Sequence, residues 1–207
     1  MSSADIIHQV NTEHKAVAFT FDDGPNPVYT PQILDIFREV SGQATFYMIG
    51  EQMLKHPEIV EAVVTEQHEI GNHTYSHPAL TQLKPEEYTD EISRTDFIIN
   101  EMTGSSPATF RPPYLDYNED IGAVCTRFGY SVIGALNGEA RDWEMPGVSH
   151  IVESTRPHAR SGSMLLFHDG FDDRSQTVEA VRILVAELAA AGFRFVTVSE
   201  LLRLGQR

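Results

Sequence analysis

The feature of this sequence that most constrains its fold is a regular alternation of short apolar runs with amphipathic segments. The short runs are rich in β-branched and aromatic residues, which is typical of buried strands. The segments between them carry apolar residues at helical spacing. The expected strands are residues 16–21, 44–49, 68–71, 108–110, 130–136, 163–167 and 193–198. The expected helices are residues 30–41, 51–67, 84–103, 119–128, 148–159 and 177–191.

About seven strand–helix units in this order predict a parallel sheet wrapped by helices, and that number of units closes more naturally into a barrel than into an open sheet. The chain has 207 residues, of which 41% are hydrophobic, and it contains no Pro/Gly/Ser-rich linker. We therefore expect one α/β domain over residues 16–207, preceded by an N-terminal lead-in over residues 1–15. Gly104 and Gly129 are expected to end two of the helices, and Pro57 to divide another.

Polar residues of unusual chemistry follow almost every expected strand. Asp22 and Asp23 come directly after the run 16–21 and precede a Gly-Pro turn. Because two adjacent charges are not tolerated inside an apolar strand, this pair is expected at its carboxyl-terminal mouth. The other residues in such positions are His73, His77, Arg111, Asp142 and His168. In a βα barrel these strand ends share one face, where active sites are built.

His73 and His77 have a spacing at which one helical turn or a tight loop directs both imidazoles at one metal ion. Two surface histidines without a metal are the alternative that the pair alone leaves open. A carboxylate as third ligand would complete a site with one open coordination position, as in catalytic zinc centres. The intervening residues Thr74, Tyr75 and Ser76 do not include the glutamate that acts as base in His-Glu-x-x-His hydrolases, so a base would have to come from another strand.

The two adjacent aspartates can divide this work. One carboxylate would ligate the cation, and its neighbour would accept a proton from the attacking water. Arg111 would hold that base ionised and oriented through a bidentate pair, although a plain salt bridge at the barrel mouth is the structural alternative. His168 is the expected general acid, and Asp142 would favour its imidazolium form.

Composition limits the partners and the location. The formal net charge of −15 argues against nucleic acid or an anionic membrane surface as a partner. No apolar stretch approaches the roughly 20 residues of a membrane span, and residues 1–10 lack the pattern of a signal peptide. We expect a soluble protein with no membrane span. The single cysteine, Cys125, is expected to be a buried structural thiol.

Five motifs follow one another over most of the chain. They are Thr20-Phe21-Asp22-Asp23-Gly24-Pro25, His73-x-x-x-His77, Arg111-Pro112-Pro113-Tyr114, Arg141-Asp142-Trp143 and Leu165-x-x-His168. This order resembles the polysaccharide deacetylase family, the NodB homology domain of carbohydrate esterase family 4. The resemblance implies a single NodB-like domain with a distorted (β/α)7–8 barrel, a bound Zn²⁺ or a related divalent metal such as Co²⁺, and removal of acetyl groups from glycans.

The resemblance also implies roles for individual residues. Asp22 matches the catalytic base, and Arg111 the residue that orients it. The residues that match the metal ligands are Asp23, His73 and His77. His168 matches the general acid, with Asp142 tuning it, and Tyr114 matches the position whose backbone N–H stabilises the oxyanion.

A further group of residues is expected to contact the substrate. Trp143 and Leu165 would line the pocket for the acetyl methyl group, and Pro113 belongs to the same binding surface. Ordinary core packing remains the alternative for Trp143 and Leu165. Glu139 stands where the family often has an aspartate, so contacts at that part of the rim are expected to differ.

The expected function is a metal-dependent hydrolase that removes N-acetyl groups from N-acetylglucosamine polymers, either chitin oligosaccharides or peptidoglycan, and releases acetate. An O-acetyl esterase acting on acetylxylan or another glycan is the first alternative, since the same groups would hydrolyse an ester. An inactive carbohydrate-binding domain on the same fold is the second. The partner would be an acetylated polysaccharide, a monomer is expected, and the resemblance favours a secreted or cell-envelope location while a cytoplasmic one stays open.

Overall fold

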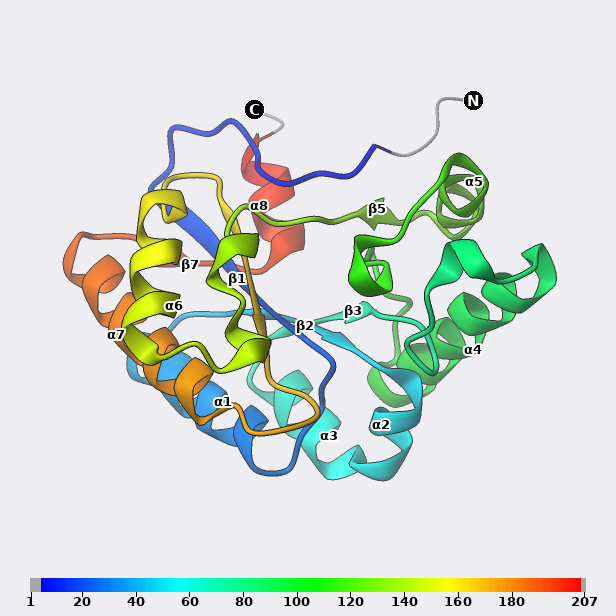
Figure 1. The fold of residues 1–207 in the computed structure, drawn as a ribbon, viewed down its shortest axis with the longest axis horizontal. Helices are drawn as coiled ribbons and strands as arrows, with labels where there is room; N and C mark the ends of the chain where they lie inside the picture. The colour runs from blue at the N-terminus through cyan, green and yellow to red at the C-terminus, as the bar shows by residue number, and fades with distance from the viewer. Residues whose placement is uncertain (1–4, 206–207) are drawn as a thin grey trace.

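The computed structural model describes residues 5–205 and contains a curled sheet of seven strands with helices around its outer side (Figure 1). Residues 1–4 of the expected lead-in and residues 206–207 lie outside the described part. The strands are β1 (Ala16–Asp22), β2 (Thr45–Met48), β3 (Glu69–Asn72), β4 (Thr109–Phe110), β5 (Ser131–Val132), β6 (Met164–His168) and β7 (Arg194–Phe195).

All the strand pairings are parallel, and the order across the sheet is β5-β4-β3-β2-β1-β6. Strand β7 pairs with the start of β1 at Ala16 and Val17, whereas β2 pairs with its end. Because every strand runs the same way, all carboxyl ends reach one edge of the curled sheet. The predicted α/β barrel with a distorted closure is confirmed.

The sheet is closed between β5 and β6 by the lead-in rather than by a strand pair. Ile7 forms a bridge to Ile133, and Gln9 forms one to Ser163. The Val10 N–H donates to the Gly162 carbonyl at 2.9 Å. The expected strand 130–136 is only two residues long. Beyond it the Gly134 N–H donates to the Ile7 carbonyl of the lead-in at 2.9 Å, and the Leu136 N–H donates to the Met164 carbonyl of β6 at 3.1 Å.

Helices follow one another around the outside of the sheet, with α7, α1, α3, α2 and α4 in that order (Figure 1). The α-helices are α1 (Tyr29–Glu39), α2 (Gly50–Lys55), α3 (Pro57–Thr65), α4 (Pro85–Thr103), α5 (Glu119–Phe128), α6 (Val148–Thr155), α7 (Ser175–Ala190) and α8 (Val198–Gly205). Short 3₁₀ turns are η1 (Leu80–Gln82), η2 (Pro113–Leu115), η3 (Gly138–Ala140), η4 (Asp142–Glu144) and η5 (Arg156–His158). Within residues 5–205, no helix combines the length and apolar character needed to cross a bilayer.

Helix α8 was not expected from the sequence, which predicted a strand through residue 198. Only two residues of that segment pair with β1, because β2 occupies the rest of the same edge. The start of α8 is held by the Glu69 carboxylate, which accepts from the Ser199 N–H at 2.9 Å and from the Ser199 hydroxyl at 2.7 Å. A carboxylate at a helix N-terminus is favourable because it meets unpaired N–H groups.

The main core lies between the sheet and the outer helices. Phe19 of β1 stacks on Phe167 of β6 at 5.5 Å between ring centroids and meets Phe37 of α1 edge-on at 5.7 Å. Side chains alternate along a strand, so the residues between these phenylalanines point to the inner side of the curl. Thr20 and Asp22 of β1, and Leu166 and His168 of β6, therefore share the inner side.

Candidate active site

The register of the sheet brings the predicted polar residues together at the carboxyl edge. Asp22, the last residue of β1, lies directly opposite His168, the last residue of β6. His73 follows β3, and Arg111 follows β4. Asp22, Asp23, His73 and Arg111 are all buried. Chain segments separated by more than 100 residues in the sequence thus supply one compact polar cluster.

Asp23, His73 and His77 form a group whose potential ligand atoms all lie within 4.8 Å of one another. The Asp23 Oδ1 atom is 3.2 Å from His77 Nε2 and 3.5 Å from His73 Nε2. This oxygen is buried and has no hydrogen-bond partner. An unpartnered buried carboxylate oxygen facing two imidazole nitrogens fits a divalent cation, and the two-histidine, one-carboxylate donor set suits Zn²⁺.

The histidines are arranged to offer their Nε2 atoms to this group. The Nδ1 atom of His73 lies 2.7 Å from the Arg111 carbonyl oxygen, and since a carbonyl only accepts, Nδ1 carries the proton. This is the orientation commonly found for metal-binding histidines. Burial and the nearby His73 lower the pKa of His77 to about 4, so His77 is neutral at pH 7. Burial opposes ionisation of Asp23, but the nearby imidazole of His73 holds the pKa of this carboxyl at about 2.

Asp22 is in a different environment from its neighbour. Its Oδ1 atom accepts a hydrogen bond of 2.6 Å from Arg111 Nη1, while its Oδ2 atom lies 3.8 Å from His73 Nε2. The expected bidentate pair is wrong, because Arg111 also donates to the Thr20 hydroxyl and, through Nε and Nη2, to the carbonyls of Ile133 and Gly134. The Tyr47 ring lies beneath the guanidinium at 4.3 Å. Arg111 is thus fixed on all sides and holds only one oxygen of Asp22.

His168 is fixed by Asp142, as the sequence predicted. Its Nδ1 atom lies 2.8 Å from Asp142 Oδ1, and its backbone N–H donates to Asp142 Oδ2. The Thr177 hydroxyl donates to Oδ2 as well, a contact from α7 that the sequence did not indicate. Burial alone would lower the pKa of His168, but the charge and hydrogen bond of Asp142 raise it to about 9. His168 is therefore in its positively charged imidazolium form at neutral pH.

The predicted substrate-contacting residues divide into exposed and buried ones. Tyr114 and Trp143 are exposed, and the Trp143 ring lies 5.1 Å from the ring of His168. Pro113 is buried and lies immediately before the exposed Tyr114. The placement of Leu165 in the methyl pocket is wrong, because Leu165 is fully buried in the core between sheet and helices. Its neighbour Leu166 is partly exposed and lies on the inner side with His168.

Several further residues of the site were missed or misjudged. Asp169, which directly follows His168, is fully buried, and burial raises its pKa to about 7. Its Oδ2 atom accepts a hydrogen bond of 2.5 Å from the Thr30 hydroxyl. Arg174 is also buried and donates to the Gly170 carbonyl at 2.9 Å. The backbone carbonyl oxygen of the exposed Glu139 accepts a hydrogen bond of 3.1 Å from His150 Nε2, in the rim segment where the sequence suggested a difference.

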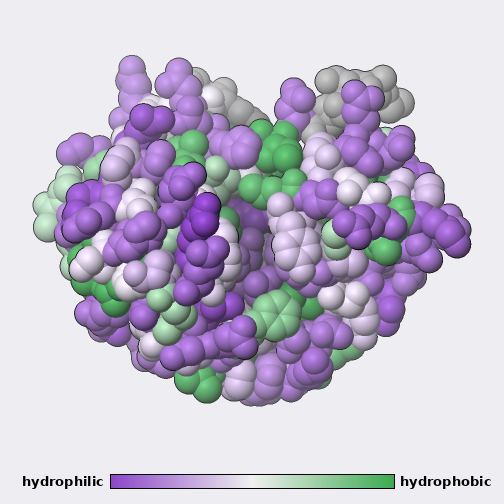
Figure 2. Space-filling view, in the orientation of Figure 1, coloured by the Kyte–Doolittle hydropathy of each residue, from purple (hydrophilic) through white to green (hydrophobic). Residues whose placement is uncertain are grey.

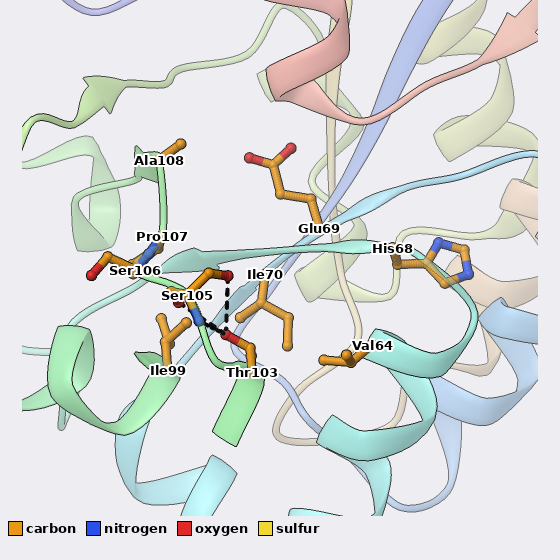
Figure 3. A pocket seen from close by; sticks show the side chains of 10 residues that line it. All are labelled: Val64, His68, Glu69, Ile70, Ile99, Thr103, Ser105, Ser106, Pro107 and Ala108. Carbon is orange, nitrogen blue, oxygen red and sulfur yellow. Dashed lines mark hydrogen bonds between the residues drawn. The ribbon is translucent and has the colours of Figure 1, made fainter. Parts of the chain in front are cut away.

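A separate pocket of about 250 Å³ lies at the opposite end of β3 and β4 (Figure 3). Its lining residues are Val64, His68, Glu69, Ile70, Ile99, Thr103, Ser105, Ser106, Pro107 and Ala108. The Glu69 carboxylate is already bonded to hydroxyls of Thr45, Thr109 and Ser199. His68 accepts the Ala44 N–H, and burial lowers its pKa to about 4. These groups serve structural contacts, so the chemistry is concentrated at the carboxyl edge.

The surface of the protein, seen in the orientation of Figure 1, is hollowed and mainly polar. Figure 2 shows a hollow near the centre of this face, surrounded mainly by hydrophilic residues with a few hydrophobic ones at its border. Few large apolar side chains are exposed anywhere in the described part of the chain.

Comparison with known proteins decides the family. The profile of the polysaccharide deacetylase family matches residues 9–133. This chain belongs to the polysaccharide deacetylase family. A peptidoglycan-N-acetylglucosamine deacetylase of Bacillus cereus is 41% identical over 196 residues, which cover 94% of this chain and 92% of the relative. A chitooligosaccharide deacetylase of Bradyrhizobium is 35% identical over 191 residues, covering 86% of this chain and 87% of the relative.

The structural comparison agrees with the family. The crystal structure of the Bc1960 peptidoglycan N-acetylglucosamine deacetylase superimposes with a TM-score of 0.88 at 32% identity, covering 94% of this chain and 91% of the other. This solved structure shares its fold with this chain over nearly the whole length of both, so the predicted fold and family are confirmed.

Proposed function

We propose that this protein hydrolyses the acetamide group of N-acetylglucosamine units in a glycan chain, with one divalent metal ion held by Asp23, His73 and His77. The relatives named as deacetylases of peptidoglycan and of chitooligosaccharides support this substrate class. The observation that carries the proposal is the different setting of two adjacent carboxylates. Asp23 has a buried oxygen without a hydrogen bond, whereas Asp22 is held by Arg111. One carboxylate is therefore a ligand and the other a base.

The metal site is defined by its three donors. A Zn²⁺ ion bound there would polarise the acetyl carbonyl and make a water molecule more acidic, and Co²⁺ accepts the same donors. The protein contributes the orientation of the donors, since the Arg111 carbonyl holds His73 with its Nε2 atom toward Asp23. Neutral histidines and an ionised Asp23 are the forms that a cation needs.

Asp22 is the proposed general base. Arg111 occupies its Oδ1 atom, so Oδ2 is the oxygen available to take a proton from the attacking water. Oδ2 lies 3.8 Å from His73 Nε2 and therefore beside the ligand cluster, but it is not among the ligand atoms grouped there. The water adds to the acetyl carbon while its proton passes to Asp22.

His168 and Tyr114 complete the reaction. Asp142 binds Nδ1 of His168, which leaves the Nε2–H to protonate the departing amine when the C–N bond breaks. The Tyr114 backbone N–H makes no hydrogen bond to another described residue, and it is the proposed donor to the oxygen that becomes negatively charged. The products are acetate and a free glucosamine amine. Such a wall or envelope polymer lies outside the cytoplasm, so an extracellular or cell-envelope location is part of the proposal.

The test is acetate release from an N-acetylglucosamine tetramer and from peptidoglycan. The protein is assayed as purified, after chelation, and after Zn²⁺ or Co²⁺ is added back. We expect release that disappears on chelation and returns with metal. Release unaffected by chelation would contradict the metal centre. Release from acetylxylan alone would replace the acetamide by an ester as substrate, and no release from any glycan would contradict an enzymatic function.

A further inference from the structure

Phe171 is an exposed aromatic residue in a strained backbone conformation. It lies in the loop between β6 and α7, and 48% of its surface is exposed. Its φ angle is 59°, in the left-handed region that bulky residues rarely adopt. A half-exposed ring adds little to the core, so core packing does not account for this strain. Strain of this kind clusters at functional sites.

The Phe171 ring stands at the candidate metal centre. The His77 ring contacts two exposed aromatic rings, with the Tyr114 centroid 4.6 Å and the Phe171 centroid 6.1 Å away. Trp143, also exposed, stands against His168 on another side of the cluster. Among the exposed aromatic residues of the described chain, Phe97 alone lies elsewhere, on α4. Exposed aromatic surface is thus concentrated around the reacting groups.

The loop that carries Phe171 is held in place by hydrogen bonds from Arg174 and Asn26. The buried Arg174 donates from Nε to the Gly170 carbonyl at 2.9 Å and from Nη1 to the Trp143 carbonyl at 3.4 Å. Asn26 Nδ2 donates to the Phe171 carbonyl at 3.3 Å. A Cβ atom on Gly170 would lie only 2.0 Å from the Asp23 carbonyl oxygen, so this loop presses against the turn that carries Asp23. The ring is therefore presented by a rigid support, which reduces the entropy lost on binding.

We infer that Phe171 is a binding platform for a pyranose ring of the glycan substrate. One face of a pyranose consists of C–H bonds and packs on an aromatic ring, while its hydroxyls remain in water. Such a platform binds an uncharged sugar in a protein whose net charge of −15 offers no attraction to an anionic one. This inference rests on the proposed function, and it adds a residue that selects glycan chains over small acetyl compounds.

The test compares a glycan with a small ester that has no sugar ring. Steady-state constants are measured for the N-acetylglucosamine tetramer and for 4-nitrophenyl acetate with the wild type, Phe171→Ala, Phe171→Leu and Phe171→Tyr. Loss of one stacking contact is expected to lower kcat/KM on the tetramer about tenfold in the Ala and Leu variants, mainly through KM. Phe171→Tyr retains an aromatic face and should stay near the wild type. Phe97→Ala, the matched exposed phenylalanine, is the control.

The outcomes separate the platform from other roles of Phe171. An equal loss on the tetramer and on the small ester would show that the ring shields His77 or holds the loop, and would overturn the platform. Full tetramer activity in Phe171→Ala would overturn it as well. A wild type that releases no acetate from any N-acetylglucosamine oligomer with metal present would instead overturn the proposed function itself, and the platform with it.

Discussion

At the scale of single residues, the site depends on the different backbone conformations and contacts of two neighbouring aspartates. Asp22 ends β1 in regular strand geometry, and the register with β6 sets it opposite His168. Asp23 has a φ angle of 74°, which turns its side chain out of the strand direction and toward His73 and His77. Aspartate tolerates this left-handed conformation better than most residues. One backbone turn thus converts sequence neighbours into groups with separate chemistry.

Replacing Asp22 tests this division. Asp22→Asn should lower kcat on the N-acetylglucosamine tetramer by about 10²- to 10⁴-fold, because the base is lost. Metal content, measured by elemental analysis, should remain near that of the wild type. Asp23→Asn should lose both activity and metal, and Asp35→Asn, an exposed aspartate on α1, is the matched control with full activity. Loss of metal in Asp22→Asn would contradict its assignment as base.

The protonation of His168 can be followed without any substrate. The chain has one tryptophan, Trp143, and its ring lies 5.1 Å from His168. Because the pKa of His168 is raised to about 9, its imidazolium form exists below that pH and should quench Trp143 fluorescence. In the metal-free protein, we expect fluorescence to increase as the pH rises through 9.

Two variants check the origin of that transition. Asp142→Asn removes the carboxylate that raises the pKa of His168, so the fluorescence transition should move to lower pH. His168→Gln should abolish it. A wild-type midpoint near 6.5, the ordinary histidine value, would contradict the coupling between His168 and Asp142.

The raised pKa of His168 also makes the stability of the fold depend on pH. Since this pKa is higher in the folded state than in the unfolded state, the contribution of protonated His168 to the free energy of unfolding is complete below pH 6.5 and is lost as the pH rises through 9.

At the scale of elements, the ends of helices were predicted more accurately than the lengths of strands. Helix α5 has the predicted bounds 119–128, and Gly104 and Gly129 end two helices with φ angles of 75° and 78°. These endings are encoded locally because glycine adopts the left-handed conformation without strain. The predicted strands 130–136 and 193–198 were too long, since their pairing depends on distant segments.

The same difference applies to the site: its strand-end residues could be predicted from the sequence, but contacts between distant segments could not. Residues at strand ends were identified by motif, and the sheet brings them together. Leu165 was assigned to the wrong face because side-chain direction depends on strand register, and a shift of one residue reverses it. Thr177 and Arg174 were missed because their contacts with Asp142 and Trp143 join segments that are adjacent only in the fold.

The N-cap of α5 provides a prediction about stability. The Asn118 side chain accepts a hydrogen bond of 3.0 Å from the Ile121 N–H. Asn118→Ala should lower the free energy of unfolding by about 1 kcal/mol, because that N–H loses its partner. Asn118→Ser should restore most of the difference, since serine also caps helices. Urea denaturation followed by circular dichroism measures both, and equal stability of the Ala and Asn forms would contradict the cap.

At the scale of the whole molecule, the net charge of −15 is the dominant property. Like charges repel in the compact state, and salt screens them over a Debye length that falls from about 30 Å at 0.01 M to about 8 Å at 0.15 M. The melting temperature should therefore rise when sodium chloride is increased over this range. Scanning calorimetry measures the change, and a melting temperature that falls would show that favourable ion pairs outweigh the repulsion.

The lead-in that closes the sheet between β5 and β6 has a consequence for synthesis on the ribosome. Ile7 and Gln9 are translated before their partners Ile133 and Ser163, which emerge more than 100 residues later. At about 5–20 residues per second, the lead-in waits on the order of ten to thirty seconds before it can pair. The sheet cannot close between β5 and β6 during that time, because β6 has not yet been translated. The ring is thus completed by a segment that is translated before both of the strand ends that it joins.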